Sequence, residues 1–175
     1  MITGGFAHDL YEQVRLIEAS QSLEGMPLYP CALELLDGRV LNCAYVVSAS
    51  DCKRFKIQSG SAEEGDSRWV AAVDVGLIRE SPMRLPAKFA GELRRAGESG
   101  MGYWVFTVVF SWFRRREYVQ SFVDFIEYPD GKGPDDVKKV IPHKGRREVG
   151  SVSSLEVYWC VLDFPSATNS LHVLS

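Results

Sequence analysis

The stretch YWVFTVVFSWF, residues 103–113, decides the fold of this chain. Aromatic and β-branched residues fill it, and large apolar side chains recur at every second position, which is the spacing of a β-strand with one buried face. The pattern predicts a central strand. Its buried face is expected to carry Trp104, Phe106, Val108, Phe110 and Trp112, with Thr107 on the opposite face.

The segments around this strand carry weaker signals. Residues 87–96 predict an amphipathic helix that ends at Gly97, the residue type that commonly closes a helix. Residues 117–128 keep helical spacing, but their residue types favour a strand. We interpret them as a strand that pairs with residues 103–113, with a helix as the alternative. A turn cluster at 129–134 is expected to lead into a short helix over 135–140.

The N-terminal half predicts a helix over residues 8–20, followed by a β-hairpin with strands at 28–36 and 39–48. Asp37-Gly38 favours a two-residue turn that sets Leu36 opposite Arg39. In this register one hairpin face is apolar. The other face, which holds Cys43 and Tyr45, is mixed, and we expect it to be half exposed to solvent.

The rest of the chain predicts three further strands, at residues 54–58, 69–78 and 153–163. Residues 59–67 are expected to form a mobile loop, and residues 165–175 a loosely structured tail. Strands that outnumber helices, without regular β-α alternation, indicate an α+β fold. We expect a mostly antiparallel sheet of about six strands, with two or three helices packed on one face.

The composition is that of an ordinary globular protein. Among 175 residues, 46% are hydrophobic and 25% are charged, which excludes a disordered or fibrous chain. We expect one domain over residues 1–175 that folds without metal or disulfide support. The N-terminus lacks a secretory signal and no apolar run is long enough to cross a bilayer, so we expect a cytoplasmic protein with no membrane partner.

The chain has four cysteines, each isolated among apolar residues, and no Cys-x-x-Cys pair. This pattern gives little support for a zinc site and predicts free, buried thiols, so no cofactor is expected. The predicted hairpin register places Cys31 opposite Ala44. Cys31 and Cys43 then point to opposite faces of the sheet and cannot form a disulfide with each other.

The glycine-rich segment 97–102 partly resembles the G-x-S-x-G motif of hydrolases around Ser99, but Met101 occupies the second glycine position. In those enzymes a strand precedes the serine and a helix follows it, whereas here the predicted order is reversed. We therefore expect a connecting loop rather than a catalytic site.

Asp124 has no second carboxylate at a spacing that would indicate a shared site. The simpler interpretation is that its side chain points outward from a strand, and the alternative is that the carboxylate faces inward.

Basic residues are concentrated in one part of a chain whose net charge is -3. Residues 114–147 are the only segment with an excess of basic over acidic side chains, so any basic surface must come from there. Lys138 and Lys139 could converge with the other cations of this segment into a basic patch beside Trp112 and Tyr118, and a solvated surface or hairpin turn is the alternative for the arginine run. The candidate anion-binding residues are Arg114, Arg115, Arg116, His143, Lys144, Arg146 and Arg147.

Composition and motifs leave three classes of function. A small non-enzymatic interaction protein of bacterial type, such as an inhibitor or an immunity-like protein, ranks first, because the chain has an acidic net charge and no catalytic constellation. Its partner would be another protein, and a second copy of this chain, in a homodimer, is the alternative. A small-ligand-binding protein or enzyme with a site near residues 97–102 ranks second. A nucleic-acid-associated protein that uses residues 114–147 ranks last.

Overall fold

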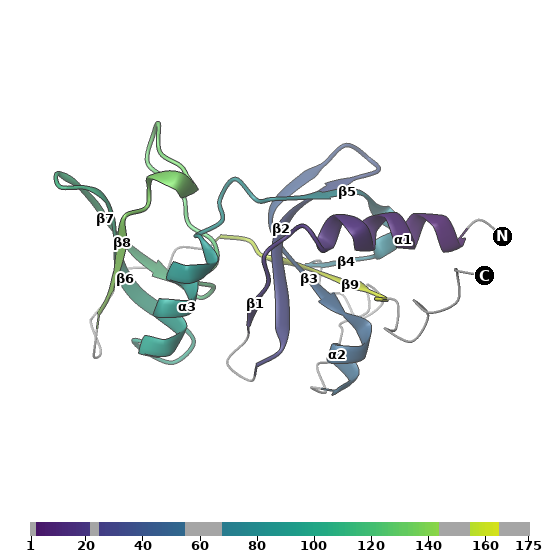
Figure 1. The fold of residues 1–175 in the computed structure, drawn as a ribbon, viewed down its shortest axis with the longest axis horizontal. Helices are drawn as coiled ribbons and strands as arrows, with labels where there is room; N and C mark the ends of the chain where they lie inside the picture. Colours follow the sequence, from purple (N-terminus) through teal and green to yellow (C-terminus); the bar gives the residue numbers. More distant parts are fainter. Residues whose placement is uncertain (1–2, 22–24, 55–67, 144–154, 165–175) are drawn as a thin grey trace, which may run out of the picture.

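The computed structural model describes residues 3–21, 25–54, 68–143 and 155–164. Within these ranges the fold is α+β, with three α-helices and nine strands in two sheets (Figure 1). Most strand pairs are antiparallel, so the predicted fold class is confirmed. The sequence suggested about six strands in one sheet, whereas the strands are divided between two.

The larger sheet has six strands in the order β1-β2-β3-β9-β4, and β5 also pairs with β2. These strands are β1 (Ser20–Gln21), β2 (Pro27–Leu35), β3 (Val40–Ser48), β4 (Trp69–Val70), β5 (Val75–Arg79) and β9 (Tyr158–Leu162). Strand β9 runs parallel to both β3 and β4. The sheet is therefore mixed, and the last strand of the described chain lies inside it.

The hairpin between β2 and β3 closes differently from the sequence prediction. The amide of Leu35 donates to the carbonyl of Arg39 at 2.8 Å, so the loop spans residues 36–38 rather than two residues. Gly38 has a φ of 88°, the left-handed conformation that glycine adopts without strain. The register then shifts between Cys31 and Leu33, and this shift preserves the predicted pairing of Cys31 with Ala44.

Both faces of the larger sheet are covered. Helix α1 (Thr3–Val14) packs on one face through Leu10 and Val14. On the other face, Tyr45 is only 1% exposed because Phe122 and Phe125 pack against it. The prediction that this face is half exposed is wrong. The residues that cover this face are distant in sequence, so the pattern of the hairpin residues does not predict that they pack there.

The smaller sheet has the order β7-β6-β8 and packs against helix α3. Its elements are β6 (Trp104–Ser111), β7 (Arg114–Gln120), β8 (Lys139–Pro142) and α3 (Ala87–Ala96). Trp104, Phe106, Val108 and Phe110 are buried toward the helix, as predicted. The helix ends at Gly97, whose φ of 84° confirms the predicted closure. Figure 1 shows α3 between the smaller sheet and β1.

Several boundaries in the N-terminal half differ from the predictions. Helix α1 ends at Val14 rather than at Ser20, because Ser20 pairs with Leu28 in the sheet. Arg54 ends a helix, α2 (Ala49–Arg54), instead of starting a strand. The strand predicted over 69–78 is interrupted by a 3-10 helix, η2 (Ala72–Asp74).

Boundaries in the second half also change. Strand β7 confirms the strand interpretation up to Gln120, but residues 121–128 contain only an isolated bridge between Phe125 and Arg84. The helix predicted over 135–140 is wrong in its second half. A 3-10 helix, η3 (Pro134–Asp136), precedes β8, whose first residues pair with β6. The predictions for 55–58, 59–67 and 165–175 lie outside the described residues.

All four cysteines are free and buried, as predicted. Cys31 and Cys43 belong to different core clusters on opposite faces of the larger sheet. Burial raises the pKa of Cys43 to about 11 and that of Cys160 to about 12. No helix in the described part of the chain is long and apolar enough to cross a bilayer.

Candidate functional site

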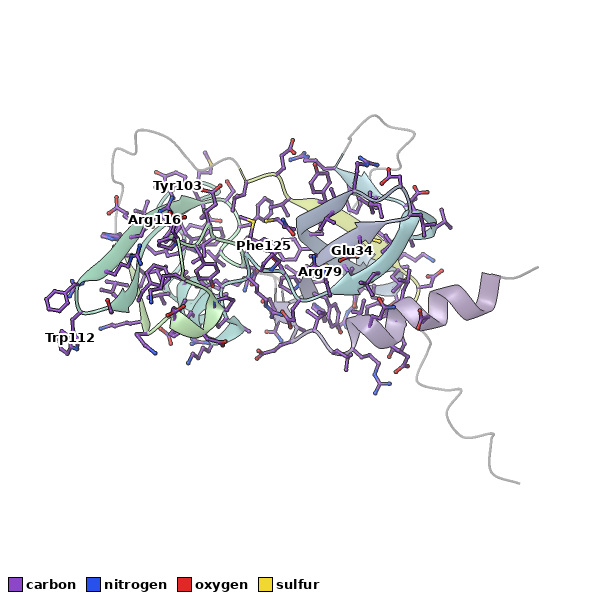
Figure 2. All side chains as sticks on the ribbon, turned by 90° about the horizontal axis from the view of Figure 1, so that it is seen from above. Glu34, Arg79, Tyr103, Trp112, Arg116 and Phe125 are labelled. Carbon is purple, nitrogen blue, oxygen red and sulfur yellow. The ribbon has the colours of Figure 1, made fainter. Side chains whose placement is uncertain are left out.

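The hairpin formed by β6 and β7 exposes two aromatic side chains at its turn. Ser111 pairs with Arg114, so Trp112 and Phe113 form the connection between the two strands. Trp112 is 88% exposed and Phe113 is fully exposed. Figure 2 shows Trp112 projecting from one end of the molecule. The prediction that Trp112 belongs to the buried face is wrong, because β6 ends one residue before it.

An apolar groove lies beside this turn, on the face of the smaller sheet that is turned away from α3. Its volume is about 630 Å³. Val109 and Ile141 provide apolar lining, and Trp112 lies at the hairpin end. The strand register places Arg115 and Lys139 on either side of Val109. Cations therefore flank an aliphatic surface.

We call this region the hairpin face and define it by the eight residues Val109, Trp112, Phe113, Arg114, Arg115, Lys138, Lys139 and Ile141. Four of them are cations, and none of the four forms a salt bridge with a carboxylate among the described residues. The hairpin face thus combines exposed aromatic side chains with four cations that form no salt bridge with a carboxylate of the described residues.

The three consecutive arginines do not act as one cluster. Arg115 points to the groove, whereas Arg116 pairs with Val108 and lies toward the α3 side of the sheet. The guanidinium of Arg116 lies 5.3 Å from the centre of the Tyr118 ring and 3.9 Å from a carboxylate oxygen of Glu127. Strand alternation separates neighbouring arginines in this way. Arg116 is therefore already engaged within the chain.

His143 lies on the same outer face but away from the hairpin turn. Its Nε2 is 3.0 Å from the hydroxyl of Thr107 and 3.6 Å from a carboxylate oxygen of Glu117. These contacts place His143 beside a carboxylate rather than beside the groove cations. Lys144, Arg146 and Arg147, the other predicted anion-binding residues, lie outside the described residues.

Arg114 and Arg115 are predicted site residues that belong to the hairpin face, whereas Trp112 is a predicted core residue and Lys138 and Lys139 are not among the candidate anion-binding residues. The signal for the turn is weak, because Trp112 and Phe113 are themselves typical strand residues. The pairing of Lys139 with Val109 depends on the order of the strands in the sheet, which single-residue patterns do not reveal.

The glycine-rich connection around Ser99 is held by hydrogen bonds to the backbone of neighbouring segments. The Ser99 hydroxyl accepts a hydrogen bond from the Val105 amide at 2.9 Å and donates to the His143 carbonyl at 3.0 Å. The ring of His143 faces Thr107 instead. At Gly100 a side chain would overlap the ring of Tyr103. These contacts attach the segment to the smaller sheet. Ser99 does not line the groove.

A buried polar cluster joins the two sheets. Asp124 is completely buried, and its carboxylate accepts hydrogen bonds from the Ser20 and Tyr45 hydroxyls, each at 2.6 Å. The guanidinium of Arg94 on α3 also donates to it. The simpler interpretation of Asp124 as an outward strand residue is wrong, because residue 124 follows the end of β7 and turns inward. Its oxygens hold three elements together.

No group of three or more His, Cys, Asp or Glu side chains within the described ranges is arranged to hold a metal ion. Comparison of the chain with protein-family models, curated proteins and solved structures finds no match. The function is therefore inferred from the geometry and charge of the hairpin face.

Proposed function

We propose that this protein is a non-enzymatic interaction protein that binds an acidic protein partner through the hairpin face. The observation that carries the proposal is the exposure of Trp112 and Phe113 beside four cations that form no salt bridge within the described residues. Aromatic side chains and arginine are the residues that most often dominate the binding energy of protein interfaces. A partner with carboxylates around an apolar anchor would complement this arrangement.

The apolar part of the hairpin face favours an anchor that enters the groove. Val109 and Ile141 offer aliphatic surface, and Trp112 adds an aromatic wall. Soluble proteins seldom leave two neighbouring aromatic side chains in water unless a partner covers them. Burying Trp112 and Phe113 in an interface would remove this apolar surface from water and stabilise the complex.

A protein partner fits the site better than a nucleic acid does. Single-stranded nucleic acids bind to grooves in which aromatic rings stack with successive bases along a basic track. Here the two exposed aromatic side chains of the hairpin face lie together at the turn, and Val109 and Ile141 line the groove beyond it. The carboxylates of Glu117 and Glu127 lie next to the arginine run. These carboxylates would repel a phosphate backbone that continued along β7.

In-cell photo-crosslinking followed by reconstitution tests the proposal. A photoreactive phenylalanine replaces Trp112 in one variant and Val73, which is 71% exposed on η2, in the control. We expect a discrete protein adduct from position 112 only. With that partner purified, Trp112→Ala should weaken binding by about 2 kcal/mol, the scale of an interface hot spot.

Arg115→Ala should weaken the same complex and make its affinity less sensitive to salt, since the partner is expected to be acidic. A crosslink to nucleic acid would contradict the proposal in favour of the third class of function. An adduct that contains only this chain would identify a homodimer instead. Equal affinity of the Trp112→Ala variant and the unmodified protein would exclude the hairpin face as the binding site.

A further inference from the structure

A cavity of about 420 Å³ lies between α3 and the segment that forms β1. Residues 18–21 line one side, and Ala87, Lys88, Gly91, Arg94 and Arg95 of the helix line the other. None of these residues belongs to the hairpin face. Figure 1 shows α3 and β1 side by side, which places the cavity at the junction of the two sheets. Its volume falls within the range of small-molecule sites.

Arg94 is fixed at this cavity by a buried carboxylate. Its guanidinium donates to Asp124, which Ser20 and Tyr45 hold through two further hydrogen bonds. The Arg94 side chain is only 14% exposed, so little conformational freedom remains for a ligand to freeze. A guanidinium has five N–H donors, and Asp124 does not use all of them. Arg94 is thus a preorganised donor on the cavity wall.

Gly91 leaves one part of the cavity wall without a side chain. It stands in the interior of α3, where glycine destabilises a helix relative to alanine. A Cβ atom at this position would meet only the guanidinium of Arg95, at 3.4 Å, which is ordinary van der Waals contact. The absence of a side chain at Gly91 leaves this part of the cavity open beside the Arg95 guanidinium.

Positive charge exceeds negative charge around the cavity. Lys88, Arg94 and Arg95 line it, while Glu18 is the one carboxylate among its described lining residues. The ammonium of Lys88 lies 4.6 Å from the centre of the Phe89 ring, which keeps it on the helix surface. Arg94 is balanced by Asp124, so Lys88 and Arg95 outweigh Glu18. The field at the cavity favours an anion.

We propose that this cavity binds a small molecule through an oxyanion group, either a phosphate or a carboxylate. Arg94 and Arg95 approach it from one helix, and a guanidinium can donate two parallel hydrogen bonds to either group. The open space above Gly91 accommodates the rest of the molecule. This inference rests on residues other than those of the hairpin face, so it stands or falls separately from the proposed partner binding.

Titrations at constant ionic strength test the proposal. The probes are inorganic phosphate, ribose 5-phosphate, succinate and, as the neutral control, ribose. Amide signals of Gly91 and Gln21 are followed by heteronuclear NMR. We expect saturable shifts with the anionic probes and none with ribose. Comparison of succinate with ribose 5-phosphate shows which oxyanion is preferred.

Three variants separate binding in the cavity from general attraction to positive charge. Arg95→Ala should weaken binding about tenfold, because it removes a charged donor. Gly91→Leu keeps every cation but fills the cavity, and it should weaken binding by about the same factor. Lys53→Ala removes one exposed charge on α2 and should leave the affinity unchanged. Circular dichroism checks that each variant is folded.

If Gly91→Leu fails to fold, Gly91→Met replaces it, because its flexible, unbranched side chain also occupies the cavity and should weaken binding by filling it. The proposal is overturned by any one of three results. These are the absence of saturable shifts with every anionic probe, shifts confined to the amides of Lys138 and Lys139, and unchanged affinity in the folded cavity-filling variant.

Discussion

Asp124 is the residue on which the junction of the two sheets depends. A carboxylate that is completely buried is costly unless its oxygens accept hydrogen bonds and its charge is balanced. Here Ser20 and Tyr45 from the larger sheet and Arg94 from α3 provide both. A single side chain therefore ties β1, β3 and α3 to the segment after β7.

Replacing this carboxylate tests its role. Asp124→Asn should destabilise the protein by about 3–5 kcal/mol, because it leaves the Arg94 guanidinium buried without its counter-charge. Tyr45→Phe should cost less, about 1.5–3 kcal/mol, since it removes one hydrogen bond to a charged group and keeps the ring packing. Urea unfolding measures both. Similar stability of Asp124→Asn and the unmodified protein would contradict a role as a junction.

Tyr45 also predicts how stability depends on pH. Burial, and then the neighbouring Asp124, raise the pKa of Tyr45 well above 10.0. Above pH 10 the phenol ionises in the unfolded chain but not in the folded one, so unfolding releases a proton there. Stability should be constant below pH 10 with respect to this group and should fall as the pH rises further.

Urea midpoints between pH 8 and 11 measure this effect. Tyr118, whose pKa burial raises to about 12, contributes in the same direction, so the loss should be reduced rather than abolished in the Tyr45→Phe variant. An identical pH dependence in the two proteins would mean that the Tyr45 phenol is not protected from ionisation.

At the scale of elements, strand β6 organises the smaller sheet, and its register can be tested. Phe106 is completely buried between β6 and α3, and Phe106→Ala should cost about 3–5 kcal/mol. Thr107 is on the other face, and its hydroxyl forms a hydrogen bond with the His143 ring. Thr107→Ala should cost about 1 kcal/mol. Denaturant titration of both variants checks the register; a greater loss at Thr107 would reverse the faces.

The hairpin turn, in contrast, should contribute little to stability. Trp112 is 88% exposed, so Trp112→Ala should change the free energy of unfolding by about 0.5 kcal/mol or less. The same variant is expected to lose partner binding, which separates a binding role from a structural one. A large loss of stability, measured in the same urea titration, would show that Trp112 packs against the sheet more than its exposure indicates.

Local periodicity was enough to predict β6, α3 and the β2–β3 hairpin. Each of these elements has an apolar pattern that its own residues complete, as the alternation from Trp104 to Phe110 illustrates. The predicted loop at Gly38 is one residue too short. The predicted pairing further along the strands is still correct, since the register shift between Cys31 and Leu33 compensates for the extra loop residue. Turn chemistry alone does not contain that information.

The candidate sites were harder to predict, because each combines elements that are distant in sequence. The hairpin face needs β8 beside β6, and the cavity needs α3 beside β1. Asp124 looked like an ordinary strand residue, since its partners Ser20 and Tyr45 are 104 and 79 positions away. Sequence reasoning found Arg114 and Arg115 from their charge but had no means of locating the end of β6.

At the scale of the whole molecule, the two sheets share a core as well as the Asp124 cluster. Phe125, from the segment that follows β7, is completely buried against Tyr45 of β3. The same segment sends Val123 and Ile126 into the core of the smaller sheet. Neighbouring residues of one short stretch thus enter both cores, and we expect the sheets to unfold together.

Thiol labelling tests whether the sheets unfold together, because all four cysteines lie in the cores of the larger sheet. All four cysteines belong to the two core clusters of the larger sheet, whereas Phe106 belongs to the core of the smaller one. Burial also raises the pKa of Cys43 and Cys160, so the folded protein should hardly react with an aromatic disulfide reagent at pH 8. Labelling then measures the opening of the larger sheet.

If the sheets unfold as one unit, Phe106→Ala should speed the labelling of these distant thiols by the same free energy that it removes in urea unfolding, about 3–5 kcal/mol. Ser20→Ala removes one hydrogen bond to Asp124 from the side of the larger sheet, and it should also speed labelling without altering the contacts of Phe106. Labelling that remains slow in Phe106→Ala while the smaller sheet unfolds would mean that the larger sheet is stable alone. Asp124 would then be a local contact rather than the link between the two sheets.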